Sequence, residues 1–123
     1  MLKISRLLVF AVVGLLLVGC AQNQAPIIRL KTEPNPAVGE APLRVVLDAT
    51  KTIDPEGDIM RFYWFWKEGG RRITVGGPKI IHNFKENTEV VLMVMDERRN
   101  IATKRISIVV LVRSSQLTSK GQK

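Results

Sequence analysis

The stretch DPEGDIMRFYWFW, Asp54–Trp66, decides the predicted fold because it joins a tight turn to an aromatic strand. In Asp54–Asp58 the proline presets one backbone angle, the glycine accepts a positive φ, and the carboxylates are placed to accept bonds from nearby N–H groups. Ile59–Trp66 contains neither glycine nor proline and is rich in aromatic side chains, which is typical of a half-buried strand. Five of the chain's seven aromatic residues occupy positions 62–66, so this strand is expected to supply the centre of the core.

The rest of the chain predicts further strands and no helix. After residue 26 no segment shows helical periodicity, and turn residues recur every 6–12 positions. The segment 33–42 contains three prolines and is predicted to be an irregular edge segment or turn. Six or seven strands in this arrangement indicate an all-β, antiparallel β-sandwich. The expected strands span residues 27–32, 43–49, 59–66, 73–75, 79–84, 89–95 and 101–112.

Side chains alternate along a strand, so the inward and outward faces follow from the sequence. The predicted core residues of the three longest strands are Phe62, Trp64, Trp66, Val90, Leu92, Val94, Ile106, Ile108 and Val110. Their neighbours then form an apolar outward face, where a solvated antiparallel sheet normally carries polar residues. Either the linker or the tail folds over this face, or the face contacts a partner or a second copy of the chain. Its predicted contact residues are Tyr63, Phe65, Val91, Met93 and Met95.

The N-terminus reads as a secretory signal peptide. A basic start is followed by the twelve-residue apolar run Leu7–Val18, which is shorter than a bilayer-spanning helix. Leu17-Val18-Gly19-Cys20 resembles the lipobox of bacterial lipoproteins. That resemblance implies cleavage before Cys20, attachment of a diacylglyceryl group to its sulfur and acylation of the new amino end, with fatty chains such as palmitate. It also accounts for Cys20 being the only cysteine. Ala21 after the cysteine favours the outer membrane if the source has two membranes.

The chain carries a net charge of +8, and the positive charge gathers near the C-terminus. From Arg98 to Lys123 seven residues are basic and none is acidic. Such a segment is attracted to anionic lipid headgroups or acidic polymers, although a solvated surface explains the same residues without a partner. A nucleic-acid partner is not expected, because the chain is predicted to be exported and has no nucleic-acid-binding motif.

A family resemblance emerges from the order of short motifs. The domain resembles a PKD (polycystic kidney disease) domain, an immunoglobulin-like sandwich, over about residues 26–112. The chain departs from the family pattern at Phe65, where the family has Asp, at Lys67, where it has Gly, and at Glu86 or Asn87. The matching segments are Asn35-Pro36, Asp54-Pro55-Glu56-Gly57-Asp58, Trp64–Gly69, His82-Asn83-Phe84 and Val90–Asp96.

Four carboxylates are candidate metal ligands. Asp54, Glu56 and Asp58 alternate within one turn, and Asp96 ends a strand that is expected to approach the same region. Oxygen ligands of this kind suit Ca²⁺, and some PKD-like domains bind calcium near corresponding turns. The alternative is an Asx-type turn with Glu56 solvated.

No catalytic residues are predicted. The only histidine, His82, is expected to be packed with one ring nitrogen hydrogen-bonded rather than to act as a base, and no nucleophile set or phosphate loop is present. The expected organisation is a signal peptide (1–19), a lipidated linker (20–25), a PKD-like β-sandwich (26–112) and a basic disordered tail (113–123).

The sequence therefore predicts a lipid-anchored, non-enzymatic module of the cell envelope. The PKD resemblance implies contacts with proteins or carbohydrates, without identifying the partner. The alternative is a structural spacer, or a phage-encoded surface lipoprotein that blocks a receptor.

Overall fold

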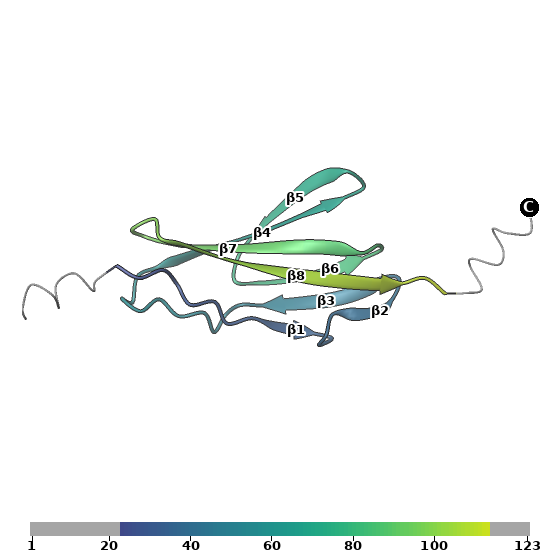
Figure 1. The fold of residues 1–123 in the computed structure, drawn as a ribbon, viewed down its shortest axis with the longest axis horizontal. Helices are drawn as coiled ribbons and strands as arrows, with labels where there is room; N and C mark the ends of the chain where they lie inside the picture. Colours follow the sequence, from purple (N-terminus) through teal and green to yellow (C-terminus); the bar gives the residue numbers. More distant parts are fainter. Residues whose placement is uncertain (1–22, 114–123) are drawn as a thin grey trace, which may run out of the picture.

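The computed structural model of the chain describes residues 23–113, which form an immunoglobulin-like β-sandwich of two sheets (Figure 1). The smaller sheet has the order β1-β3-β6, and the larger has the order β2-β8-β7-β4-β5. The expected signal peptide, Cys20 and almost all of the expected tail lie outside the described residues. The strands are β1 (Lys31–Glu33), β2 (Val38–Glu40), β3 (Leu43–Asp48), β4 (Met60–Glu68), β5 (Arg71–Gly76), β6 (Lys79–Phe84), β7 (Thr88–Asp96) and β8 (Ile101–Leu111).

The three longest strands, β4, β7 and β8, lie side by side in one sheet. β7 pairs antiparallel with both β4 and β8, so Trp64 lies opposite Leu92 and Val90 lies opposite Ile106. β5 pairs antiparallel with the outer edge of β4, and the β4–β5 hairpin stands out from the body of the sandwich in Figure 1.

The proline-rich segment contains a strand that was not predicted. Val38–Glu40 runs parallel to β8, the one exception among otherwise antiparallel strand pairs in the described chain. Prolines on both sides lack an N–H group, which limits the strand to three residues. Gly39 fits here because a Cβ atom at this position would lie 2.6 Å from a methyl carbon of Leu43.

The first strand begins later than predicted. Ile27 forms an isolated bridge with Ile53, and the Arg29 N–H donates to the Thr52 hydroxyl at 3.2 Å. The backbone before β1 is therefore bonded to the loop that precedes the acidic turn, and regular pairing with β3 starts only at Lys31.

The core lies between the sheets and contains the residues predicted from strand alternation. Trp64, Val90, Leu92 and Val94 are fully buried, and Phe62 packs against the cluster from a partly buried position. The smaller sheet contributes residues such as Val45, which is also fully buried. Inward residues of both sheets therefore meet in one apolar layer, as in other β-sandwiches.

The acidic turn forms as its sequence predicts. The Gly57 N–H donates to the Asp54 carbonyl oxygen at 3.0 Å, and Gly57 has a φ of 72°, a conformation that glycine adopts without a Cβ clash. The turn lies at the same end of the sandwich as Asn23, because the next residue, Gln24, donates its N–H to Glu56 of the turn at 2.8 Å. Asn23 Oδ1 in turn accepts a 2.6 Å hydrogen bond from Asn100, which follows the β7–β8 turn.

The two ends of the described chain lie at opposite ends of the sandwich (Figure 1). β8 runs along the length of the larger sheet, away from the acidic turn and toward Arg113. Between Asn23 and Arg113, the structure has no helix that is long and apolar enough to cross a membrane.

Candidate functional site

The five predicted contact residues lie together on the outer surface of the larger sheet. Tyr63 on β4 is directly opposite Met93 on β7, and Phe65 is directly opposite Val91. Met95 continues the row along β7. All five side chains are half-buried, which is consistent with a face that is in contact with solvent but partly covered by its own neighbours.

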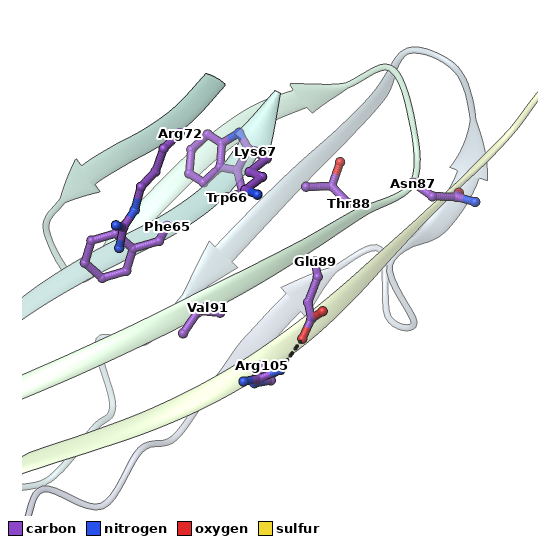
Figure 2. A pocket seen from close by; sticks show the side chains of 9 residues that line it. All are labelled: Phe65, Trp66, Lys67, Arg72, Asn87, Thr88, Glu89, Val91 and Arg105. Carbon is purple, nitrogen blue, oxygen red and sulfur yellow. Dashed lines mark hydrogen bonds and ion pairs between the residues drawn. The ribbon is translucent and has the colours of Figure 1, made fainter. Parts of the chain in front are cut away.

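Basic side chains surround the aromatic part of this face. On β5, Arg72 lies opposite Lys67 and Thr74 lies opposite Phe65. The guanidinium carbon of Arg72 lies 5.0 Å from the centroid of the Phe65 ring, a cation–π contact (Figure 2). The contact holds the Arg72 side chain along the outer surface of the β4–β5 hairpin.

The surface between the hairpin and β8 is hollowed into an open groove of about 500 Å³ (Figure 2). We call it the aromatic–basic groove. It covers the half of the outer face that is nearest the β4–β5 turn, so Phe65 and Val91 belong to it, whereas Tyr63, Met93 and Met95 lie beyond its lining. The lining residues are Phe65, Trp66, Lys67, Arg72, Asn87, Thr88, Glu89, Val91 and Arg105.

The charge of the groove is positive. Three of its lining side chains are basic and one, Glu89, is acidic. Glu89 is already paired with Arg105, whose Nη1 atom lies 3.2 Å from its carboxylate (Figure 2). Within residues 23–113, Lys67 and Arg72 have no ion pair. The groove therefore presents two uncompensated cations beside an aromatic ring.

Sequence reasoning missed the basic side chains of this groove. Thr74 is paired with Phe65, and alternation along β5 then places Arg72 on the same face. The predicted strand began only at Ile73 and therefore left Arg72 out. Arg105 was noted only as part of the C-terminal charge excess, and nothing in its local sequence indicates that β8 brings it opposite Val91.

Three of the four candidate metal ligands meet at the other end of the sandwich. Asp54, Asp58 and Asp96 each offer a carboxylate oxygen, and these oxygens lie within 4.8 Å of one another. Glu56 is not part of that set and points instead to Arg98. The register explains the meeting, because β4 begins at Met60 directly opposite Asp96 at the end of β7.

The two buried aspartates of the cluster are oriented by backbone N–H groups. Asp54 accepts hydrogen bonds from the N–H groups of Glu56 at 3.2 Å and Asp58 at 2.9 Å. Asp96 accepts from the N–H groups of Arg98 at 2.9 Å and Asn100 at 2.8 Å. Burial opposes ionisation of Asp96, but the bonds from Asn100 and Arg98 outweigh it, and the pKa of Asp96 is lowered.

Arg98 supplies a positive charge beside the cluster. Its Nη1 atom lies 2.8 Å from Glu56 Oε2, and its Nε atom lies 3.5 Å from Asp58 Oδ2. Glu56 is not solvated, because its other oxygen accepts a 2.8 Å bond from the Gln24 N–H and its side chain is only 15% exposed. For Asp58, burial raises the pKa despite the attraction of Arg98, and the neighbouring carboxylates raise it further.

The carboxylates fit a calcium ion in chemistry and spacing. Asp54, Asp58 and Asp96 offer hard oxygen ligands, and backbone bonds hold two of them in place before any ion arrives. Arg98 already compensates part of the negative charge. The negative charge of the cluster can therefore be balanced in two ways, by the Arg98 guanidinium that the structure shows or by a bound cation of the kind that these oxygens suit.

His82 is packed and hydrogen-bonded. Its Nε2 atom lies 2.9 Å from a carboxylate oxygen of Glu68, and its ring packs against those of Trp66 and Phe84, at centroid distances of 4.9 and 4.8 Å. The Trp66 indole nitrogen is buried without a hydrogen-bond partner among the described residues. No nucleophilic side chain accompanies the histidine in these contacts.

Comparison with known proteins finds similarity among solved structures. No protein-family model matches the chain, and no curated protein matches it. A structure solved in work on the structural basis for the promiscuous specificity of carbohydrate-binding modules from the β-sandwich superfamily aligns with a TM-score of 0.56 and 28% sequence identity. The alignment covers 74% of this chain and 36% of that one, so the chain spans about a third of its length.

Proposed function

We propose that this protein is a non-catalytic binding module of the cell envelope that holds a glycan or protein partner on the outer face of its larger sheet. The observation that carries the proposal is the aromatic–basic groove on a sandwich similar to one studied among carbohydrate-binding modules. Binding sites commonly combine an apolar or aromatic surface with a few polar groups that fix orientation. The groove combines Phe65 and Val91 with Asn87, Thr88 and the charged side chains around them.

The proposal includes a lipid anchor at Cys20 and membership of the PKD-like group, both of which rest on sequence motifs. Cys20 precedes Asn23 by three residues, which span at most about 10 Å. Asn23 is hydrogen-bonded to Asn100 beside the acidic cluster. An anchored molecule would thus hold its acidic end close to the membrane.

The same anchor would place the groove away from the membrane. Phe65 lies five residues along β4 from Met60, or roughly 17 Å at about 3.3 Å per residue, and Met60 is paired with Asp96 of the acidic end. The groove would therefore face envelope polymers or proteins beyond the lipid surface. This orientation suits a membrane-anchored module that binds an envelope polymer or protein.

The test is co-sedimentation of the protein with an insoluble envelope polysaccharide fraction and with an envelope protein extract. We expect the wild-type chain to be retained by one of them, and Phe65→Ala to reduce retention. Ile81→Ala is the matched control, because Ile81 is an exposed apolar residue on β6 of the other sheet. Retention that is equal in wild type and Phe65→Ala would contradict the proposed face.

A further inference from the structure

We propose that the partner of the aromatic–basic groove is a polysaccharide that carries carboxylate groups; this inference rests on the proposed binding function and names its ligand class. The charge of the groove, the contact of Phe65 with Arg72 and the place of the groove in the fold support this ligand class.

Charge complementarity is the first step. Lys67 and Arg72 extend from adjacent strands, lie opposite each other in the register, and have no ion pair among the described residues. The only acidic side chain of the groove is already paired with Arg105. A neutral ligand would leave both cations uncompensated, whereas an anionic ligand would satisfy them.

The geometry of Arg72 is the second step. Its guanidinium lies over the Phe65 ring at 5.0 Å, so the side chain is held before a ligand binds and less conformational freedom is lost on binding. A guanidinium presents N–H donors in a planar fork that matches the two oxygens of a carboxylate. Thr88 and Asn87 line the same groove. The Thr88 hydroxyl donates to the Glu86 carbonyl oxygen and Asn87 Oδ1 accepts from the Val110 N–H, so the Thr88 oxygen as an acceptor and the Asn87 NH₂ group as a donor remain for sugar hydroxyls.

The place of the groove argues against a membrane surface as its occupant. The groove lies toward the β4–β5 turn, whereas Asn23 lies at the opposite end beside Asn100. A protein anchored just before Asn23 would direct its acidic end, rather than this groove, toward lipid headgroups.

A second basic hollow provides an internal comparison. It lies near β1 and is lined by four basic residues and one acidic residue, among them Lys51 and Lys104, but it has no aromatic ring. Lys104 is adjacent to Arg105 in β8 but lines this second hollow instead of the groove. Substitution of Lys104 therefore removes the same charge from a nearby site outside the groove.

The experiment is a calorimetric titration of the full chain, in neutral detergent, with oligogalacturonate and with its fully methyl-esterified form. The ester has the same sugar backbone without the charges. We expect oligogalacturonate to bind at least about tenfold more tightly than the ester, and Lys67→Gln or Arg72→Gln to weaken it about tenfold, as for the loss of a charge-assisted contact. Lys104→Gln should leave its affinity unchanged, and high salt should weaken binding.

Each contrary result has a definite meaning. Equal binding of the acid and the ester, weakened in both cases by Phe65→Leu, would overturn the carboxylate inference and leave the proposed function standing. Equal weakening by Lys104→Gln and Arg72→Gln would overturn it in favour of unspecific charge attraction. Failure of both saccharides to bind would also overturn it, and binding of phosphatidylglycerol vesicles in that case would assign the groove to a membrane. The proposed function itself fails only if retention in the co-sedimentation test is independent of Phe65.

Discussion

The indole nitrogen of Trp64 donates a 2.7 Å hydrogen bond to the carbonyl oxygen of Gly77. Trp64 is fully buried at the middle of β4, and Gly77 lies in the connection between β5 of the larger sheet and β6 of the smaller one. One side chain therefore fills the core and also fixes the loop that crosses between the sheets. A phenylalanine at this position would fill much of the same space but could not donate this bond.

We expect Trp64→Ala to lower the free energy of unfolding by ~3–5 kcal/mol, because it leaves a large cavity. Trp64→Phe keeps much of the apolar volume but leaves the Gly77 carbonyl without its donor, so its cost should be smaller, about 1–3 kcal/mol. Urea unfolding of the three proteins measures both values. An alanine variant that melts within a few degrees of wild type would show that Trp64 is not a central core residue.

Much of this fold was predictable because strand alternation is a local property. The period of two in Phe62, Trp64 and Trp66, and again in Val90, Leu92 and Val94, correctly identified the inward faces. The Asp54 turn was predictable for the same reason, since proline and glycine at these positions fix the backbone without help from distant residues.

The features that escaped prediction depend on contacts between distant residues. β2 exists because Val38 pairs with Val109, far along the chain, and proline-rich sequence gives no local sign of it. The role of Arg98 in the acidic cluster was likewise hidden, because only the register of β4 and β7 brings its turn to Glu56. The groove required four adjacent strands, β5, β4, β7 and β8, to place Arg72, Phe65 and Arg105 on one surface.

We expect Cys20 to be lipidated and the chain to be cut before it, because Leu17–Cys20 follows a twelve-residue apolar run. Two or more acyl chains would make membrane attachment stable, whereas a single chain gives only marginal binding. Cys20→Ser should give an uncut or soluble form. Intact-mass spectrometry of membrane-extracted protein measures the modification, and an unmodified Cys20 in the mature wild-type chain would contradict the prediction.

We expect millimolar Ca²⁺ to raise the melting temperature of the wild-type chain, since an ion that binds only the folded state stabilises it by mass action. Asp58→Asn should abolish this effect by removing one of the three clustered oxygens. Asp48→Asn is the matched control, because Asp48 bonds with Thr50 outside the cluster. A wild-type melting temperature that is insensitive to Ca²⁺ would show that Arg98 and the loop N–H groups suffice to stabilise the three carboxylates without an ion.

The same variant tests the charge balance without calcium. Because the folded-state pKa of Asp58 is raised above its ordinary value of 3.8, ionised Asp58 opposes folding at neutral pH, and the opposition is relieved as the pH falls through the folded-state pKa. Asp58→Asn should therefore melt higher than wild type at pH 7 in a chelator. The difference should shrink toward pH 4, and a lower melting temperature at pH 7 would contradict this assignment.

The outer face is large enough for association, but its charges oppose pairing with itself. Burying about 400 Å² of apolar surface at about 25 cal/mol/Å² yields ~10 kcal/mol, which is similar to the cost of association. A two-fold dimer brings the same patch of both copies together, so the basic residues around Phe65 would face one another. A partner of opposite charge has no such penalty.

We therefore expect the lipid-free chain to sediment as a monomer at low ionic strength, where repulsion between Lys67, Arg72 and their copies is least screened. High salt removes this penalty and should favour any dimer that forms. Phe65→Lys should stay folded, because Phe65 faces outward opposite Val91, and should remain monomeric under both conditions. Sedimentation velocity with parallel thermal melting measures both properties. A stable dimer at low salt that Phe65→Lys dissolves would show that the face pairs with itself, and unfolding of Phe65→Lys would show that the residue is internal.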